Sequence, residues 1–90
     1  MIKTISRTTR FKKDFKTAQK QKKDISKFET VLKLLLQNQS LPDKYKDHQL
    51  INFSEFRECH ITPDWLLIYK IIDDELILYR LGSHAELFNK

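Results

Sequence analysis

Cysteine, glycine, proline and tryptophan are scarce in this chain of 90 residues, which contains one Cys, one Gly, two Pro and one Trp. A single cysteine, Cys59, excludes a disulfide within the chain. One cysteine and three scattered histidines also lack the spacing of a zinc site, so we expect no metal and no cofactor. The only glycine, Gly82, ends a predicted strand, where we expect it to supply a backbone conformation that other residues resist.

Long apolar runs are also missing. The first ten residues contain no stretch that would serve as a signal peptide, and no window approaches the length of a membrane span. We therefore expect a cytoplasmic protein in a reducing compartment, with no membrane partner. Ninety residues are enough for one domain, and we assign residues 1–90 to it.

Positive charge is concentrated at the start of the chain. Residues 1–27 contain ten Lys or Arg and two Asp, a net charge of +8, whereas residues 28–90 contain seven Lys or Arg and ten Asp or Glu, a net charge of −3. A basic segment of this kind is either a polyanion-binding surface or a solvated helix face, and we weigh the two equally. On the first alternative, the RNA-binding side chains are the lysines Lys12, Lys13, Lys16 and Lys20.

Two helices are predicted in the first half of the chain, because apolar residues recur there three and four positions apart. The first helix is expected from Thr8 or Thr9 to about Lys23, and the second from Asp24 to Leu36. Threonine and aspartate are good N-caps. The connection between the helices is short, so we expect an antiparallel helical hairpin.

Strands are predicted where the apolar period changes to two or the chain is continuously apolar, at residues 2–6, 56–62, 65–72 and 75–81. A polar loop over 37–47 separates the helices from the last three strands. The predicted fold is α+β, with the order β-α-α-β-β-β and the helical hairpin packed on one face of a mainly antiparallel sheet. The opposite face is left partly open, which suits a functional site.

The residues most suited to chemistry lie at the ends of the last strands. In a three-strand meander the first and third strands run in the same direction, so their ends meet at one edge of the sheet. This topology brings together His60, Asp64, Arg80 and His84, and the alternation of side chains places Glu58 on the same face as His60. Each of these residues also has a purely structural reading; for example, Asp64 is the turn residue that commonly follows a proline.

Three residues each have two open assignments. Arg80 lies in an apolar strand and needs an anionic partner, which is either Glu58 in the structure or a phosphate in function. Phe88 is either part of the core or a platform on which a nucleobase stacks. His48 lies in a predicted loop and is either a ligand-binding residue or an exposed residue without a role in binding.

Four segments together resemble the YafQ-type toxins of the RelE/ParE superfamily. They are Lys44-Tyr-Lys-Asp-His48, Arg57-Glu-Cys-His60, Pro63-Asp-Trp-Leu-Leu-Ile-Tyr69 and Leu81-Gly-Ser-His84 followed by Leu87-Phe88. The resemblance covers residues 44–88 closely and the whole chain in length and element order. Members commonly have a glycine in the loop after the Lys-Asp-His motif, whereas residues 50–57 here contain none.

The resemblance implies a RelE-like fold and a bacterial type II toxin that cleaves messenger RNA, typically in the ribosome. It implies contact with ribosomal RNA and a cognate, DinJ-like antitoxin protein that neutralises the toxin. Operator DNA is expected to be contacted only through the antitoxin.

The family's functional residues map onto this chain by motif position. His84 takes the place of the catalytic histidine, Arg80 of the phosphate-binding arginine, and Phe88 of the C-terminal aromatic residue. The remaining site positions are His48, His60, Asp64 and Glu58.

These residues suggest metal-independent RNA cleavage, in which a ribose 2′-OH attacks the adjacent phosphorus and leaves a 2′,3′-cyclic phosphate. Free histidine has a pKa of about 6.5 and serves as acid or base near neutral pH. We assign His84 as the general acid and His60 as the base, with Asp64 or Glu58 orienting it or replacing it. The alternatives are a non-catalytic interaction module that acts as co-repressor with its antitoxin, a gyrase-directed toxin, and a ribonuclease that needs no ribosome.

Overall fold

The computed structural model of the chain describes residues 1–50 and 55–88. Its elements follow in the order β1 (Thr4–Arg7), α1 (Thr9–Lys20), α2 (Ile25–Leu36), the 3-10 helix η1 (Asp43–Tyr45), β2 (His48–Gln49), β3 (Arg57–Thr62), β4 (Trp65–Ile72), β5 (Glu75–Gly82) and α3 (His84–Phe88). Among these helices, none is long and apolar enough to cross a membrane.

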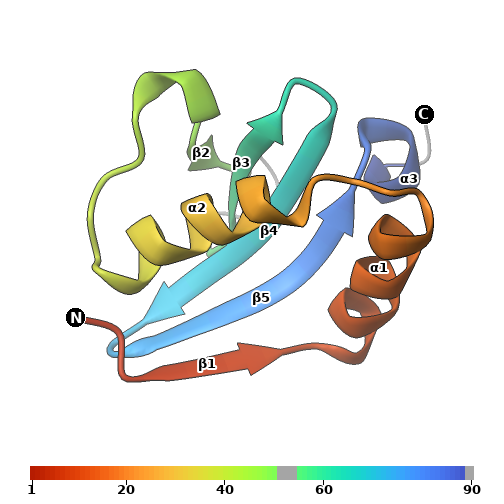
Figure 1. The fold of residues 1–90 in the computed structure, drawn as a ribbon. Coiled ribbons are helices and arrows are strands. Elements are labelled where there is room, and N and C mark those ends of the chain that lie inside the picture. Colours follow the sequence, from red (N-terminus) through yellow and green to blue (C-terminus); the bar gives the residue numbers. More distant parts are fainter. Residues whose placement is uncertain (51–54, 89–90) are drawn as a thin grey trace.

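One five-stranded sheet forms the centre of the molecule, in the order β1-β5-β4-β3-β2 (Figure 1). The β1 strand pairs with β5 in parallel, and every other pair is antiparallel. The predicted α+β class and mainly antiparallel sheet are therefore confirmed. Two elements were not predicted: His48 belongs to the edge strand β2 rather than to a loop, and residues 84–88 form α3 rather than an irregular tail.

Both predicted N-caps are confirmed at the starts of the long helices. The hydroxyl of Thr8 accepts a hydrogen bond from the Phe11 amide at 3.0 Å, and the carboxylate of Asp24 accepts one from the Ser26 amide at 3.1 Å. Each cap supplies a partner for an amide that the first turn of a helix leaves unpaired.

The main core lies between the two long helices and one face of the sheet. The α1 and α2 helices meet through the rings of Phe11, Phe15 and Phe28, whose centroids are 5.8 to 6.1 Å apart. On the sheet side, Cys59, Ile61, Trp65, Leu67, Tyr69, Leu76, Leu78 and Leu81 are buried against these helices. The strand β3 thus turns Cys59 and Ile61 to the core, as its alternation predicted.

The other face of the sheet therefore receives Glu58 and His60. A bulge in β5 adjusts which residues share this face: Ile68 pairs with Arg80 and Tyr69 with Leu78, so that β5 contains one extra residue at this point. Glu58, Ile68 and Arg80 consequently lie in one row across β3, β4 and β5.

Gly82 has a different function from the one predicted for it. Its φ is not positive, so it does not supply a special backbone conformation. A Cβ at this position would instead lie 3.1 Å from Oε1 of Glu86 and 3.3 Å from a methyl carbon of Leu87. The missing side chain is what allows α3 to pack closely against the end of β5.

Candidate active site

Three histidines from three separate elements form a row on the face of the sheet opposite the long helices. The ring centroids of His48 in β2 and His60 in β3 are 6.4 Å apart, and those of His60 and His84 at the start of α3 are also 6.4 Å apart. The aromatic ring of Phe88 follows at 5.2 Å from the His84 ring. The predicted meeting of His60 and His84 at one sheet edge is confirmed.

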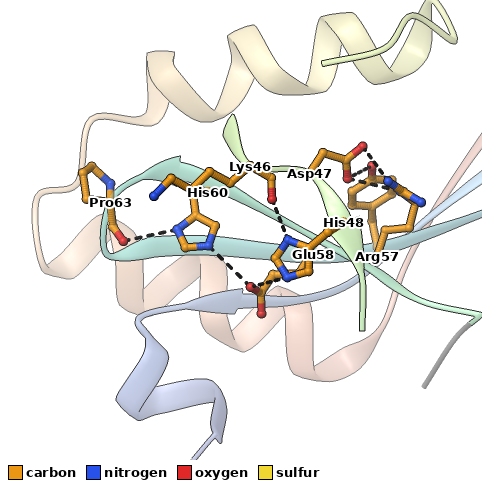
Figure 2. Close-up of polar contacts among 8 residues, drawn as sticks. Lys46, Asp47, His48, Arg57, Glu58, His60 and Pro63 are labelled. Atoms are coloured by element: carbon orange, nitrogen blue, oxygen red, sulfur yellow. Dashed lines mark hydrogen bonds and ion pairs between the residues drawn. The ribbon is translucent and has the colours of Figure 1, made fainter. Parts of the chain in front are cut away.

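The carboxylate of Glu58 lies between two of these histidines (Figure 2). Its Oε1 atom is 3.4 Å from Nε2 of His48 and 3.4 Å from Nε2 of His60. The pairing of His48 with Glu58 across β2 and β3 produces the first contact, and the two-residue repeat along β3 produces the second. Glu58 is only 4% exposed, because the two rings cover it.

Backbone carbonyl groups fix the orientation of both rings. Nδ1 of His48 is 2.7 Å from the Lys46 carbonyl oxygen, and Nδ1 of His60 is 3.3 Å from the Pro63 carbonyl oxygen. A carbonyl oxygen only accepts hydrogen bonds, so Nδ1 carries a hydrogen in each ring. Nε2 of each ring is the nitrogen that faces Glu58.

His84 is positioned by a capping box at the start of α3. The Ser83 hydroxyl accepts a hydrogen bond from the Glu86 amide at 3.1 Å, and Glu86 Oε1 accepts one from the Ser83 amide at 2.8 Å. These contacts lower the pKa of the Glu86 carboxyl. In addition, the His84 amide donates to Oδ1 of Asp64 at 3.3 Å. Asp64 thus connects the β3–β4 turn to the residue predicted to be the general acid.

Arg80 and Phe88 line a pocket of about 270 Å³ beside the row of histidines. Arg10, Phe56 and Tyr79 also line it, and the Phe56 and Tyr79 rings lie 4.5 Å apart. A cationic group and several aromatic rings are the features that bind a nucleotide's phosphate and base.

The predicted structural partner of Arg80, Glu58, is wrong. Arg80 instead contacts Asp14 of α1, with 2.8 Å between Nε and Oδ2 and 3.3 Å between Nη2 and Oδ1. These contacts raise the pKa of the arginine. Arg80 has a carboxylate from α1 on one side because α1 covers the edge of β5 beyond the end of β1, while Glu58 is occupied by the histidines.

A second, partly buried network supports the segment before His48. The Asp47 carboxylate accepts a hydrogen bond of 2.7 Å from the Tyr69 hydroxyl and two of 3.2 Å from the Arg57 guanidinium. Burial, followed by the contact with Asp47, raises the pKa of the Tyr69 hydroxyl. The network attaches the residue adjacent to His48 to β3 and β4.

The four lysines predicted to bind RNA lie on α1 and are exposed, as a solvated face or an RNA-binding surface requires. They are Lys12, Lys13, Lys16 and Lys20. Their part in RNA binding stays a prediction.

Comparison with known proteins now identifies the family. Residues 3–89 match the family described as bacterial toxin of type II toxin-antitoxin system, YafQ. The chain belongs to the YafQ toxin family. The mRNA interferase toxin YafQ of Escherichia coli strain BL21-DE3 is 44% identical over 86 residues, which are 93% of this chain and 94% of that protein.

Solved structures of bacterial toxins have the same fold. This chain matches the toxin in a crystal structure of the Escherichia coli DinJ–YafQ complex with a TM-score of 0.90 and 42% identity, over 98% of this chain and 99% of that one. A metal-bound toxin from Helicobacter pylori matches with a TM-score of 0.90 and 44% identity, over 98% and 100% of the two chains. The predicted RelE-like, YafQ-type identity is confirmed.

Two groups in and beside the site were not anticipated from the sequence. Asp14 is the only carboxylate between Arg7 and Lys23, and an isolated acid in so basic a helix was a signal that it has a specific partner. The sequence Ser83-His-Ala-Glu86 has the spacing of a capping box, which would have revealed α3 and the position of His84 at its start.

Proposed function

We propose that this YafQ-family toxin is an endoribonuclease that cleaves messenger RNA on the ribosome by attack of a ribose 2′-OH on the adjacent phosphorus. The observation that carries the proposal is the continuous row of His48, His60 and His84, in which Glu58 contacts the first two rings and Phe88 lies at the end. Curated relatives 44% and 43% identical to this chain are named mRNA interferase toxins.

In the proposed reaction, His60 removes the proton of the 2′-OH through Nε2 while the Pro63 carbonyl holds the ring at Nδ1, and the Glu58 carboxylate stabilises the imidazolium that forms. His84 protonates the leaving 5′-oxygen, so that the products carry a 2′,3′-cyclic phosphate and a free 5′-hydroxyl. Asp64 holds the backbone of His84 in place. No proton is gained or lost overall in this step, because the base takes one and the acid supplies one.

Arg80 is proposed to stabilise the charge that develops on the phosphorane. Asp14 accepts hydrogen bonds from Nε and from one N–H of Nη2, which leaves Nη1 for a phosphate oxygen. A guanidinium that is already fixed by a carboxylate needs no reorganisation when the transition state forms. Phe88, in the same pocket, is proposed to stack on the base next to the cleaved bond.

The proposed reaction uses no metal ion. In the described part of the chain, no group of three or more His, Cys, Asp and Glu side chains has an arrangement that would hold one. A chelator that binds zinc and copper tightly but leaves ribosomal magnesium in place is therefore expected to leave cleavage unchanged, and loss of activity that added metal restores would contradict this part of the proposal.

The proposed partners are messenger RNA, ribosomal RNA and a DinJ-like antitoxin, with operator DNA reached only through the antitoxin and the cytoplasm as the place of action. An Escherichia coli relative has been crystallised with DinJ. The exposed lysines of α1 are proposed to lie along ribosomal RNA, and this binding is expected to weaken as the salt concentration rises.

The test is to map RNA ends in cells after brief induction of the wild-type chain or His84→Ala. New breaks within translated messages are expected for the wild type only, in a fixed position relative to the reading frame. The side chain of His84 is exposed, so the variant should fold normally, which a thermal melt would verify. Breaks made equally by a folded His84→Ala would contradict the assignment. If neither folded chain makes breaks, the interaction-module alternative replaces the enzyme.

A further inference from the structure

A groove of about 600 Å³ opens beside His60, and His84 is not among its described lining residues. It lies between α2 and the segment that runs through η1 to β2, and its floor includes His60, Ile61 and Thr62 of β3. Three lysines line it, and among its described lining residues there is no carboxylate. The lysines are Lys27 of α2 and Lys44 and Lys46 of the η1 segment.

Lys27 interacts with the Asp24 carboxylate, which is not a described lining residue of the groove, whereas Lys44 and Lys46 have no anionic partner in the described part of the chain. Every ion pair found there involves other cations: Lys3, Arg57, Arg80 and the histidines. Lys44 lies over the ring of Tyr45 at 5.1 Å, which holds its side chain without neutralising it. Two lysines without an ion pair, together with a third whose carboxylate partner is not among the described lining residues, attract an anion.

Lys46 links the groove directly to the candidate active site. It has φ of 48° and ψ of 45°, a left-handed conformation that is uncommon for a residue other than glycine. In this conformation its carbonyl oxygen accepts the hydrogen bond from Nδ1 of His48, while its side chain extends past His60 toward Pro63 (Figure 2). One residue therefore orients a site histidine and supplies a cation next to another.

We propose that this groove binds the RNA backbone on the 5′ side of the cleaved bond, with Lys44 and Lys46 contacting the phosphate next to the scissile one. The proposal rests on the proposed function, because its direction follows from the assigned roles. His60 receives the proton of the 2′-OH, which belongs to the nucleotide on the 5′ side, whereas His84 serves the leaving group on the 3′ side. His60 lines the groove and His84 is not among its described lining residues, so the 5′ segment is the one that we place in it.

An acidic segment of a protein partner is the alternative occupant of a basic groove. His60 belongs both to the candidate active site and to the lining of the groove. This favours RNA, because a strand bound at the catalytic residues must continue past His60 into this space. A partner protein does not have to pass the catalytic residues in order to reach the groove.

The test uses ribosomes programmed with synthetic messages and follows single-turnover cleavage by Lys44→Gln, Lys46→Gln and Lys27→Gln. Lys33→Gln is the matched control, because Lys33 is an exposed lysine of α2 outside the groove. We expect Lys44→Gln and Lys46→Gln each to slow cleavage about 3- to 5-fold, the size expected for a partly exposed ion pair. Lys27→Gln, from another element, is expected to have a smaller effect in the same direction, and Lys33→Gln is expected to cleave as the wild type.

Messages with one uncharged methylphosphonate linkage decide whether the contact is to that phosphate. When the linkage next to the cleaved bond on its 5′ side is neutral, we expect the cleavage rate of the wild type to fall about 3- to 5-fold. On the same message, Lys46→Gln should cause no further fall in the rate, since the two changes remove one interaction. A neutral linkage on the 3′ side should leave the full effect of Lys46→Gln in place.

Three outcomes would overturn the inference, and they are distinguishable. If the wild type cleaves but the groove variants cleave equally well, the groove is not used and the proposed function stands. If the lysine effects persist undiminished on the 5′-neutral message, or if the variants lose only antitoxin binding, a different anion occupies the groove. If the folded wild type cleaves no message at all, both the inference and the proposed function fail.

Discussion

The Asp14 carboxylate of α1 binds Arg80 of β5 through two nitrogens and also accepts a hydrogen bond of 3.0 Å from the Leu81 amide. Both side chains are less than one-fifth exposed. Asp14→Asn keeps an oxygen for the Leu81 amide but removes the charge opposite Arg80. We expect a loss of about 2 kcal/mol in the free energy of unfolding, typical of hydrogen bonds to charged groups, and cleavage slowed at least about 10-fold. Urea denaturation and single-turnover cleavage measure the two effects.

Arg80→Lys provides the matching change on the other side of this contact. Lysine keeps the positive charge but cannot make the two-point contact of a guanidinium, so we expect a loss of activity as large as that of Asp14→Asn. An Asp14→Asn variant with wild-type cleavage would show that the contact stabilises the fold without positioning Arg80 for chemistry.

The position of Glu58 between two Nε2 atoms predicts that its charge, and not only its shape, is needed. Glu58→Gln preserves size but offers an amide to one of the two rings and loses the carboxylate that both face. We expect cleavage to slow by about 10-fold or more, within the range for general acid–base groups and their supports, and the pH profile of the rate to shift. A slower reaction with an unchanged pH profile would indicate that Glu58 acts only in packing.

Much of the fold was predictable because its signals are local. The helical spacing of Phe11, Phe15 and Ala18, the N-caps at Thr8 and Asp24, and the change to a period of two each depend on residues close together in the sequence. The meeting of His60, Asp64 and His84 followed from strand direction alone. These predictions needed no knowledge of side-chain packing.

The contacts that were missed are those that local pattern does not determine. The partner of Arg80 depends on how α1 docks over the edge of β5, which joins residues 66 positions apart. The two-residue strand β2 is too short to show any alternation, and it exists because His48 and Gln49 pair with Glu58 and Arg57. The space around Gly82 likewise depends on the later turn of α3 and not on the glycine's own conformation.

Gly82→Ala tests the close packing of α3 directly. The added methyl would lie 3.1 to 3.3 Å from atoms of Glu86 and Leu87, so α3 must shift by a few tenths of an ångström. We expect a loss of about 1–3 kcal/mol in stability, as for overpacked sites, and slower cleavage because α3 carries His84 and Phe88. Ala85→Ser, at an exposed position of the same helix, is the control and should retain both properties. Wild-type activity in Gly82→Ala would mean that the position of α3 is not critical to the reaction.

The capping box at Ser83 and Glu86 predicts a specific dependence of stability on pH. Contacts with Ser83, and a hydrogen bond of 3.2 Å from Gln21, favour the charged form of Glu86 and lower its pKa in the folded protein. A lowered pKa stabilises the fold at pH values above the ordinary glutamate pKa of about 4.3, and this contribution is lost as the pH falls through the folded pKa.

The variant Glu86→Gln retains a neutral cap at every pH. Because Glu86 is exposed, we expect the free energy of unfolding of the wild type to exceed that of the variant by less than about 1 kcal/mol at pH 7. This difference should vanish in acid. Urea denaturation of both chains at pH 7, 5 and 3.5 measures this difference, in which the titration of all other groups cancels. A difference that is the same at all three values would show that the charge of Glu86 does not stabilise the helix that carries His84.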